Sequence, residues 1–264
     1  MREDLIKALL PIHGEPIDPH ALARRDLNKA MPKRFYKQAE AQWRDGAWTL
    51  CLDGKPARTP GRNAVAVPSE AAGIAIAAEW QAQKEFILPS TMPVTRVVNS
   101  ALDGVALEIE AVQAEIVKYS QTDLICYRNS DPASLEREQS AQWDPVLECF
   151  AEQLGARFVL SHGIVFVRQP AEAVAAVTSL VELVRKPLPL AALNVMTTLT
   201  GSALLSLAIS RNWISAEEGW SKAHVDEDFQ IRAWGADSDA QARRDHRWSE
   251  MQAAANLFAW TQPN

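Results

Sequence analysis

The spacing of hydrophobic and polar residues first indicates a small sheet. Residues 34–68 contain four short runs, RFYKQAEAQW, WTLCLDG, KPARTP and NAVAVP, with RDGA, DGK and PGRN between them. Asp-Gly between apolar runs favours a β-hairpin, because the turn needs positive φ values that glycine adopts without strain. Trp48, Leu50 and Leu52 alternate with Thr49 and Cys51 along the second run. This alternation predicts a strand with one buried face in a small antiparallel meander.

A helix is expected directly after this sheet, in SEAAGIAIAAEWQAQ from Ser69 to Gln83. Glu70 lies in its first turn, where the helix dipole favours an acidic side chain. A stripe of small residues would let the helix lie close to the sheet, and we expect it to cover one face. The stripe comprises Ala71, Ile74, Ala75 and Ala78.

From about residue 93 the apolar residues recur at spacings of three and four, which is typical of helices. One exception, RFVLSHGIVFVRQP, predicts a β-hairpin that turns at His162 and Gly163. The chain therefore belongs to the α+β class, with a small antiparallel β-rich N-terminal domain followed by a larger, mainly α-helical C-terminal domain. We expect an extended arm at residues 1–32 and a β-rich domain with one covering helix at 33–92. The helical domain would occupy residues 93–264, with the hairpin near 157–168.

One uncharged stretch, PLPLAALNVMTTLTGSALLSLAIS, runs from Pro187 to Ser210. Roughly 20 apolar residues can span a bilayer. However, Asn194 and the serines, threonines and prolines of this stretch weaken its hydropathy. We expect a central helix buried by other helices, not a membrane span.

Composition excludes several classes of partner. The chain has 264 residues, 47% of them hydrophobic, and a net charge of −6. A negative chain is a poor binder of nucleic acid or of an anionic membrane surface, so we expect neither nucleic acid nor membrane insertion. Three scattered cysteines without a CxxC pair argue against structural zinc and favour a reducing compartment. The first residues, MREDLIKALL, resemble neither a secretory signal nor a transit peptide, so we expect a cytoplasmic protein.

The strongest candidate for chemistry is HVDEDFQIRAWG, which begins at His224 and contains three consecutive acids. A metal site could use His224 and Asp228, which are four residues apart and lie on neighbouring helix faces. Asp226 would point away from both, and no other spaced pair of ligands accompanies them. We therefore expect no metal site and no cofactor.

The middle acid, Glu227, has a different environment. At about 100° per residue, Glu227 lies in a stripe with Trp220, His224, Ile231 and Trp234. A carboxylate among apolar residues is costly unless it is paired. Three explanations remain open: a salt bridge within the chain, a catalytic acid in a cleft beside His224, or a surface that binds another protein. The candidate arginines for the salt bridge are Arg243, Arg244 and Arg247.

No nucleophile elbow, P-loop, dinucleotide fingerprint, HExxH or kinase motif is present, so we expect a protein that is not an enzyme. Six motifs nevertheless occur in a specific order. Together they resemble the assembly chaperones of the F-type ATP synthase that bind its α subunit, the "ATP-twelve" family of mitochondria and alphaproteobacteria. The motifs are RFY from Arg34, LDGKPARTP from Leu52, VPSEAAGIAIAAEW from Val67, DLICYR from Asp123, QWDP from Gln142 and DEDFQIRAWG from Asp226.

The resemblance implies a β-rich domain followed by a helical one, and a chaperone that covers the α subunit until it pairs with the β subunit. It implies that Glu227 binds this partner, with Asp226, Asp228 and Trp234 in the same motif. It also implies a bacterial cytoplasmic member, or the mitochondrial matrix for a processed eukaryotic one. We expect a monomer. The alternatives are a small-molecule enzyme that uses Glu227 in a cleft, and a general chaperone for apolar surfaces.

Overall fold

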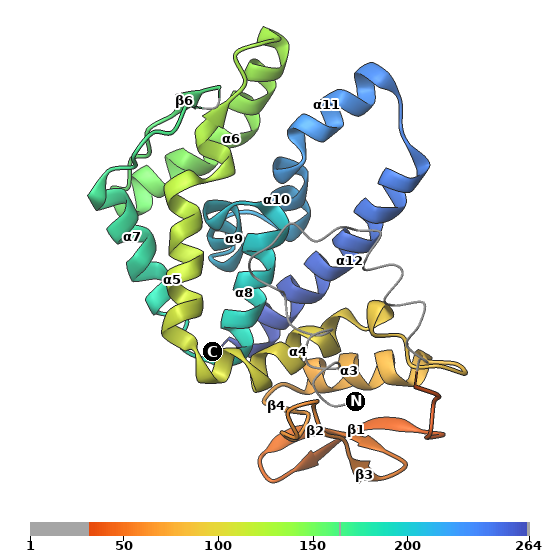
Figure 1. Ribbon diagram of the computed structural model, residues 1–264. Coiled ribbons are helices and arrows are strands. Elements are labelled where there is room, and N and C mark those ends of the chain that lie inside the picture. The colour runs from red at the N-terminus through yellow and green to blue at the C-terminus, as the bar shows by residue number, and fades with distance from the viewer. Residues whose placement is uncertain (1–31, 164, 263–264) are drawn as a thin grey trace. The chain divides into compact units, whose positions relative to one another are not determined.

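The computed structural model describes residues 32–163 and 165–262, in which a small antiparallel sheet is followed by a mostly helical region (Figure 1). The α+β assignment is thus confirmed. The chain divides into two compact units, Met1–Gly104 and Val105–Asn264. Helix α4 (Pro93–Asp103) therefore belongs to the first unit, and the domain boundary expected at residue 93 lies too early. The expected N-terminal arm falls, except for Pro32, outside the described residues.

In the first unit, β2 (Ala47–Leu52) is the central strand. It pairs in antiparallel fashion with β1 (Ala39–Arg44), β3 (Lys55–Pro56) and β4 (Ala66–Val67). Positive φ values occur at both residues of the Asp45-Gly46 and Asp53-Gly54 turns, as expected for the hairpins. The expected alternation along β2 is wrong, since all of Thr49–Leu52 are buried and both faces of the strand are covered.

Helix α3 (Glu70–Ala82) lies across the sheet and contacts β1, β2 and β4 (Figure 1). Its covering role is confirmed, but the face expected to pack is wrong. The buried residues are Ala72, Gly73, Ile76 and Ala77, whereas Ile74 is 55% exposed. Small residues occur on every face of this helix, so its sequence does not distinguish one face from another. Gly73 decides the orientation, because a Cβ there would lie 2.8 Å from the Cβ of Trp48.

The first unit ends with η1 (Pro89–Thr91) and α4. Glu79 of α3 holds the first turn of α4, where its carboxylate accepts the N–H groups of Val94 and Thr95 at 2.7 and 2.8 Å. Burial raises the pKa of Glu79, against these hydrogen bonds, which lower it.

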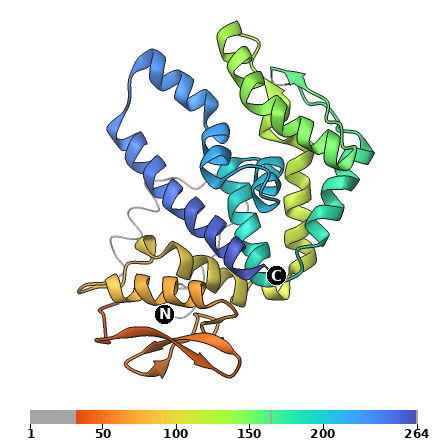
Figure 2. The same ribbon diagram turned by 180° about the vertical axis from the view of Figure 1, so that it is seen from behind.

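The second unit is a helical assembly built around α8 (Figure 2). Helix α8 contacts α5, α9, α10 and α12. The described helices of the second unit are η2 (Val105–Leu107), α5 (Ile109–Tyr119), η3 (Ser120–Thr122), η4 (Leu124–Cys126), α6 (Ala133–Leu154), α7 (Ala171–Glu182), α8 (Pro187–Thr200), α9 (Ala203–Ser210), α10 (Ala216–Ala223), α11 (Val225–Trp234) and α12 (Ser238–Thr261).

The uncharged stretch forms α8 and α9, separated at Gly201 with φ of 67°. Ser202 caps α9 by accepting the N–H of Leu205 at 2.9 Å. Most side chains of both helices are buried, as expected for the centre of a helical unit. None of the described helices has the length and apolar character needed to cross a membrane.

The expected hairpin near residues 157–168 is wrong. Strand β6 (Ser161–His162) pairs in parallel with β5 (Tyr127–Arg128). The side chain of Gln169 takes both backbone groups of Val159: it accepts the N–H at 2.8 Å and donates to the carbonyl at 2.9 Å. The backbone groups that a hairpin ladder would need at Val159 are therefore used by a side chain.

Candidate functional site

The acidic motif lies at a junction between two helices. A capping box of Ser215 and Glu218 begins α10. Helix α10 ends at Ala223, and His224 is both its C-cap residue and the residue before α11. The three acids occupy the first turn of α11, where the helix dipole stabilises negative charge. The prediction that Glu227 lies in one stripe with Trp220 and Trp234 assumed a continuous helix from Trp220 to Trp234. The helix is interrupted at His224, so the prediction does not hold across that residue.

The two flanking acids have partners within the chain. Asp226 accepts an N–H from the side chain of Gln139 in α6 at 2.6 Å. Asp228 forms an ion pair with Arg244 of α12, and this pairing raises the pKa of the guanidinium. The two carboxylates thus tie the first turn of α11 to α6 on one side and to α12 on the other.

Glu227 is less constrained. Its side chain is 45% exposed, and its Oε2 lies 3.8 Å from Nε2 of His224. In the part of the chain that the structure describes, Glu227 forms no ion pair with any of the three candidate arginines: Arg244 pairs with Asp228, and Arg247 donates to the carbonyl of Leu199 at 2.8 Å. The salt-bridge explanation for Glu227 is therefore not what the structure shows.

His224 is buried among aromatic rings. Its ring centroid lies 3.9 Å from that of Trp220, which itself lies 5.5 Å from Trp248. Burial is the main cause that lowers the pKa of His224, with help from Arg244 and Arg247. The Trp220 carbonyl and Glu227 act in the opposite direction. The imidazole is therefore neutral near neutral pH.

The far end of α11 is apolar and open. Trp234 is 89% exposed, directly before Gly235, where φ is +92°. Arg232 forms an ion pair with Glu138 of α6. The last turn of α11 is thus held to α6 by one ion pair while its tryptophan faces solvent.

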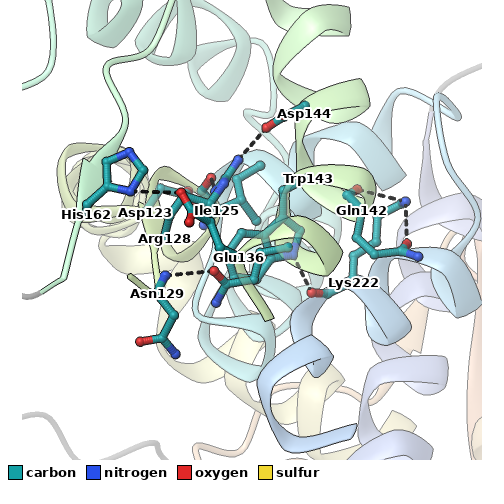
Figure 3. A network of polar contacts seen from close by, with 11 residues as sticks. Asp123, Ile125, Arg128, Asn129, Glu136, Gln142, Trp143, Asp144, His162 and Lys222 are labelled. Carbon is teal, nitrogen blue, oxygen red and sulfur yellow. Dashed lines mark hydrogen bonds and ion pairs between the residues drawn. The ribbon is translucent and has the colours of Figure 1, made fainter. Parts of the chain in front are cut away.

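Helix α6 supports α10 through residues of the QWDP motif (Figure 3). The indole N–H of Trp143 donates to the carbonyl of Lys222 at 2.7 Å. The ammonium of Lys222 in turn donates to the backbone and side-chain oxygens of Gln142 at 3.0 and 3.2 Å. Asp144 pairs at 2.6 Å with the buried Arg128, whose guanidinium lies 4.8 Å from the centre of the Trp143 ring.

The DLICYR motif supports α9, which contacts α10. Asp123 is fully buried, and its carboxylate accepts hydrogen bonds from Ser202 Oγ at 2.5 Å and from the N–H groups of Leu204 and Ile125 at 3.0 and 3.3 Å. Burial raises the pKa of Asp123 to about 6, against these hydrogen bonds, which lower it. Reasoning from residue types alone did not assign roles to Asp123, Gln139 or Trp143, although Asp123 and Trp143 lie within motifs that the resemblance rests on.

Two further observations concern metal ligands and hollows in the described residues. Within residues 32–163 and 165–262, no group of three or more His, Cys, Asp or Glu side chains could hold a metal ion. Two hollows, of about 690 and 870 Å³, lie along α5 and α7, and Glu227 lines neither of them.

Comparisons with known proteins agree on one family. A family model described as "ATP12 chaperone protein" matches residues 33–151. The mitochondrial protein atp12 of Schizosaccharomyces pombe is 26% identical in an alignment of 227 residues that covers 79% of this chain and 75% of that protein.

Two solved structures are also similar. The crystal structure of a putative chaperone from Agrobacterium tumefaciens has a TM-score of 0.85 and 42% identity, covering 98% of this chain and 97% of that one. The crystal structure of Atp12 from Paracoccus denitrificans has a TM-score of 0.78 and 36% identity, covering 88% of this chain and 99% of that one. The resemblance inferred from the six motifs is confirmed, and the chain belongs to the ATP12 chaperone family.

Proposed function

We propose that this protein is an assembly chaperone for the catalytic head of the F-type ATP synthase, and that it binds the unassembled α subunit until α pairs with β. Membership of the ATP12 chaperone family supports the chaperone role. One observation carries the choice of site. Glu227 is a half-exposed carboxylate that, among the described residues, forms no ion pair with a lysine or arginine, on a helix that also presents Trp234 to solvent.

This arrangement suits a selective chaperone. An unassembled subunit exposes an apolar surface that promotes aggregation, and an exposed tryptophan offers a large contact area for it. A carboxylate beside the tryptophan favours only a partner that brings hydrogen-bond donors or a cation. The bonds from Asp226 and Asp228 hold α11 in place before the partner arrives, which lowers the entropy lost on binding.

Co-purification with separately expressed α and β subunits tests this function. We expect the chaperone to retain α and not β, and Glu227→Lys to weaken the capture of α by about tenfold or more, because a cation would then meet the partner's donors. Glu217→Lys is the matched control, since Glu217 is an exposed acid in the first turn of α10. Retention of β instead of α, or equal effects of the two variants, would refute the proposal.

A general chaperone for apolar surfaces is the second candidate. The second unit exposes further large apolar side chains besides Trp234, among them Leu107, Val165, Phe166 and Leu183. Protection of unrelated aggregating proteins as effective as protection of α would favour this candidate over the first.

A further inference from the structure

The hydrogen bonding of His224 fixes which of its nitrogens can bind a partner. Nδ1 lies 2.7 Å from the carbonyl oxygen of Trp220, and a carbonyl oxygen only accepts. Nδ1 therefore carries the proton, and Nε2 of the neutral ring presents a lone pair. That Nε2 lies 3.8 Å from Oε2 of Glu227 and receives no hydrogen bond from any residue in the described ranges. The His224 side chain is nevertheless more than nine-tenths buried.

The pair thus presents two hydrogen-bond acceptors side by side, one of them on a carboxylate that is 45% exposed. Two acceptors that face each other at this distance repel unless a donor lies between them. We propose that His224 Nε2 and the Glu227 carboxylate together receive the guanidinium of an arginine from the partner protein. The inference rests on the proposed function, and it names the chemistry that the site recognises.

Charge around the pair favours a cation. Asp226 accepts from the neutral amide of Gln139 and Glu227 faces the neutral imidazole of His224, so within the described residues neither carboxylate forms an ion pair with a lysine or arginine. Arg244 forms its ion pair with Asp228, and Glu227 is a further acidic group close enough to act on it. Arg247 is a second cation that acts on His224, and its guanidinium lies 5.9 Å from the centre of the Trp220 ring. A guanidinium therefore already lies near the Trp220 ring. The formal charges of the three acids of α11 and of Arg244 and Arg247 sum to one negative charge.

Arginine suits the two acceptors better than lysine does. A guanidinium presents N–H groups on neighbouring nitrogens in one plane, so one can reach the imidazole nitrogen and another the carboxylate. An ammonium ion is more strongly hydrated and would lose more solvation beside the Trp220 and His224 rings.

Binding of the α subunit by the full-length chaperone provides the main test. His224→Phe keeps a ring and removes the acceptor, and we expect about tenfold weaker binding. His224→Gln keeps an acceptor near the position of Nε2 and should stay within about threefold of the unmodified protein. His246→Phe is the matched control, because His246 pairs with Glu250 at 3.6 Å on the exposed side of α12. Circular dichroism of each variant reports whether its fold is intact.

Two further measurements complete the test. The losses caused by His224→Phe and Glu227→Gln should not add in the double variant, because one guanidinium binds both residues. Binding by the unmodified protein should weaken as the pH falls far enough below neutral for Nε2 to take up a proton in place of the guest, while His224→Gln should lack this effect. Glu227 of α11 and Arg244 and Arg247 of α12 are the charged groups that face the imidazole and set this titration.

Nitrogen NMR of labelled histidine separates this inference from the proposed function. Acetyl-arginine amide should shift the His224 Nε2 signal more than acetyl-lysine amide does, and Glu227→Gln should abolish the difference. Capture of α that His224→Phe leaves unchanged would overturn the inference and leave the chaperone function standing. An arginine-dependent shift without any capture of α would overturn the proposed chaperone function and leave the inference standing. This titration also decides the matter if His224→Phe fails to fold.

Discussion

The side chain of Gln139 joins two segments of the chain that are 87 residues apart, because its amide donates to Asp226 at 2.6 Å. The amide oxygen of the same side chain accepts the backbone N–H of Asn129 at 2.8 Å. Gln139 is 1% exposed. A single buried glutamine therefore positions the first turn of α11 relative to α6 and β5.

Replacement of this glutamine should loosen α11. We expect Gln139→Leu to lower the free energy of unfolding by about 1–2 kcal/mol, because Asp226 and the N–H of Asn129 lose their partner. Urea denaturation measures the change. Gln241→Leu is the control, since exposed Gln241 makes a similar bond to Asp245 at 2.7 Å and should cost less than about 0.5 kcal/mol. Equal losses at the two positions would contradict a positioning role for Gln139.

The buried carboxyl of Asp123 should make stability depend on pH. Its pKa is about 6 in the folded protein and 3.8 in its ordinary state, so the folded protein binds the proton more tightly. The resulting stability is fully present below about pH 4 and is lost as the pH rises through about 6. The expected loss from this group is on the order of 3 kcal/mol.

Asp123→Asn removes the titrating group and should remove this fall between about pH 4 and 6. Urea unfolding of both proteins at several pH values isolates the effect, since the other acids titrate in both. Asp245→Asn, which alters an exposed carboxyl of α12, should retain the dependence of the unmodified protein. An unchanged pH dependence in Asp123→Asn would show that this carboxyl does not titrate in the folded state.

Close packing of α3 on the sheet should be sensitive to one methyl group. A Cβ at position 73 would lie 2.8 Å from the Cβ of Trp48 and 3.3 Å from that of Ala41. We expect Gly73→Ala to destabilise the protein by about 1–2 kcal/mol, because overpacking outweighs the gain in helix propensity. Ile74→Ala, at the exposed neighbouring position, should change thermal stability little. A more stable Gly73→Ala variant would mean that α3 can move away from the sheet without cost.

Local chemistry explains which elements could be predicted. Both Asp-Gly turns formed as expected, since their positive φ values depend on the two turn residues themselves. The packed face of α3 was mispredicted because its small residues provide no contrast between faces. The hairpin near residue 160 was mispredicted because a side chain at the end of the same stretch, that of Gln169, takes the backbone groups of Val159.

The sequence by itself determined the fold class, the two hairpins, most helices and, through six ordered motifs, the family. These properties depend on residues close together in the chain or on their order. Only the tertiary structure decided which of the three acids remains available. Asp226 and Asp228 receive their partners from α6 and α12, while Glu227 receives only a neutral imidazole. Helical spacing gives the direction of a side chain, but the partner that neutralises a carboxylate comes from whichever distant segment packs beside it.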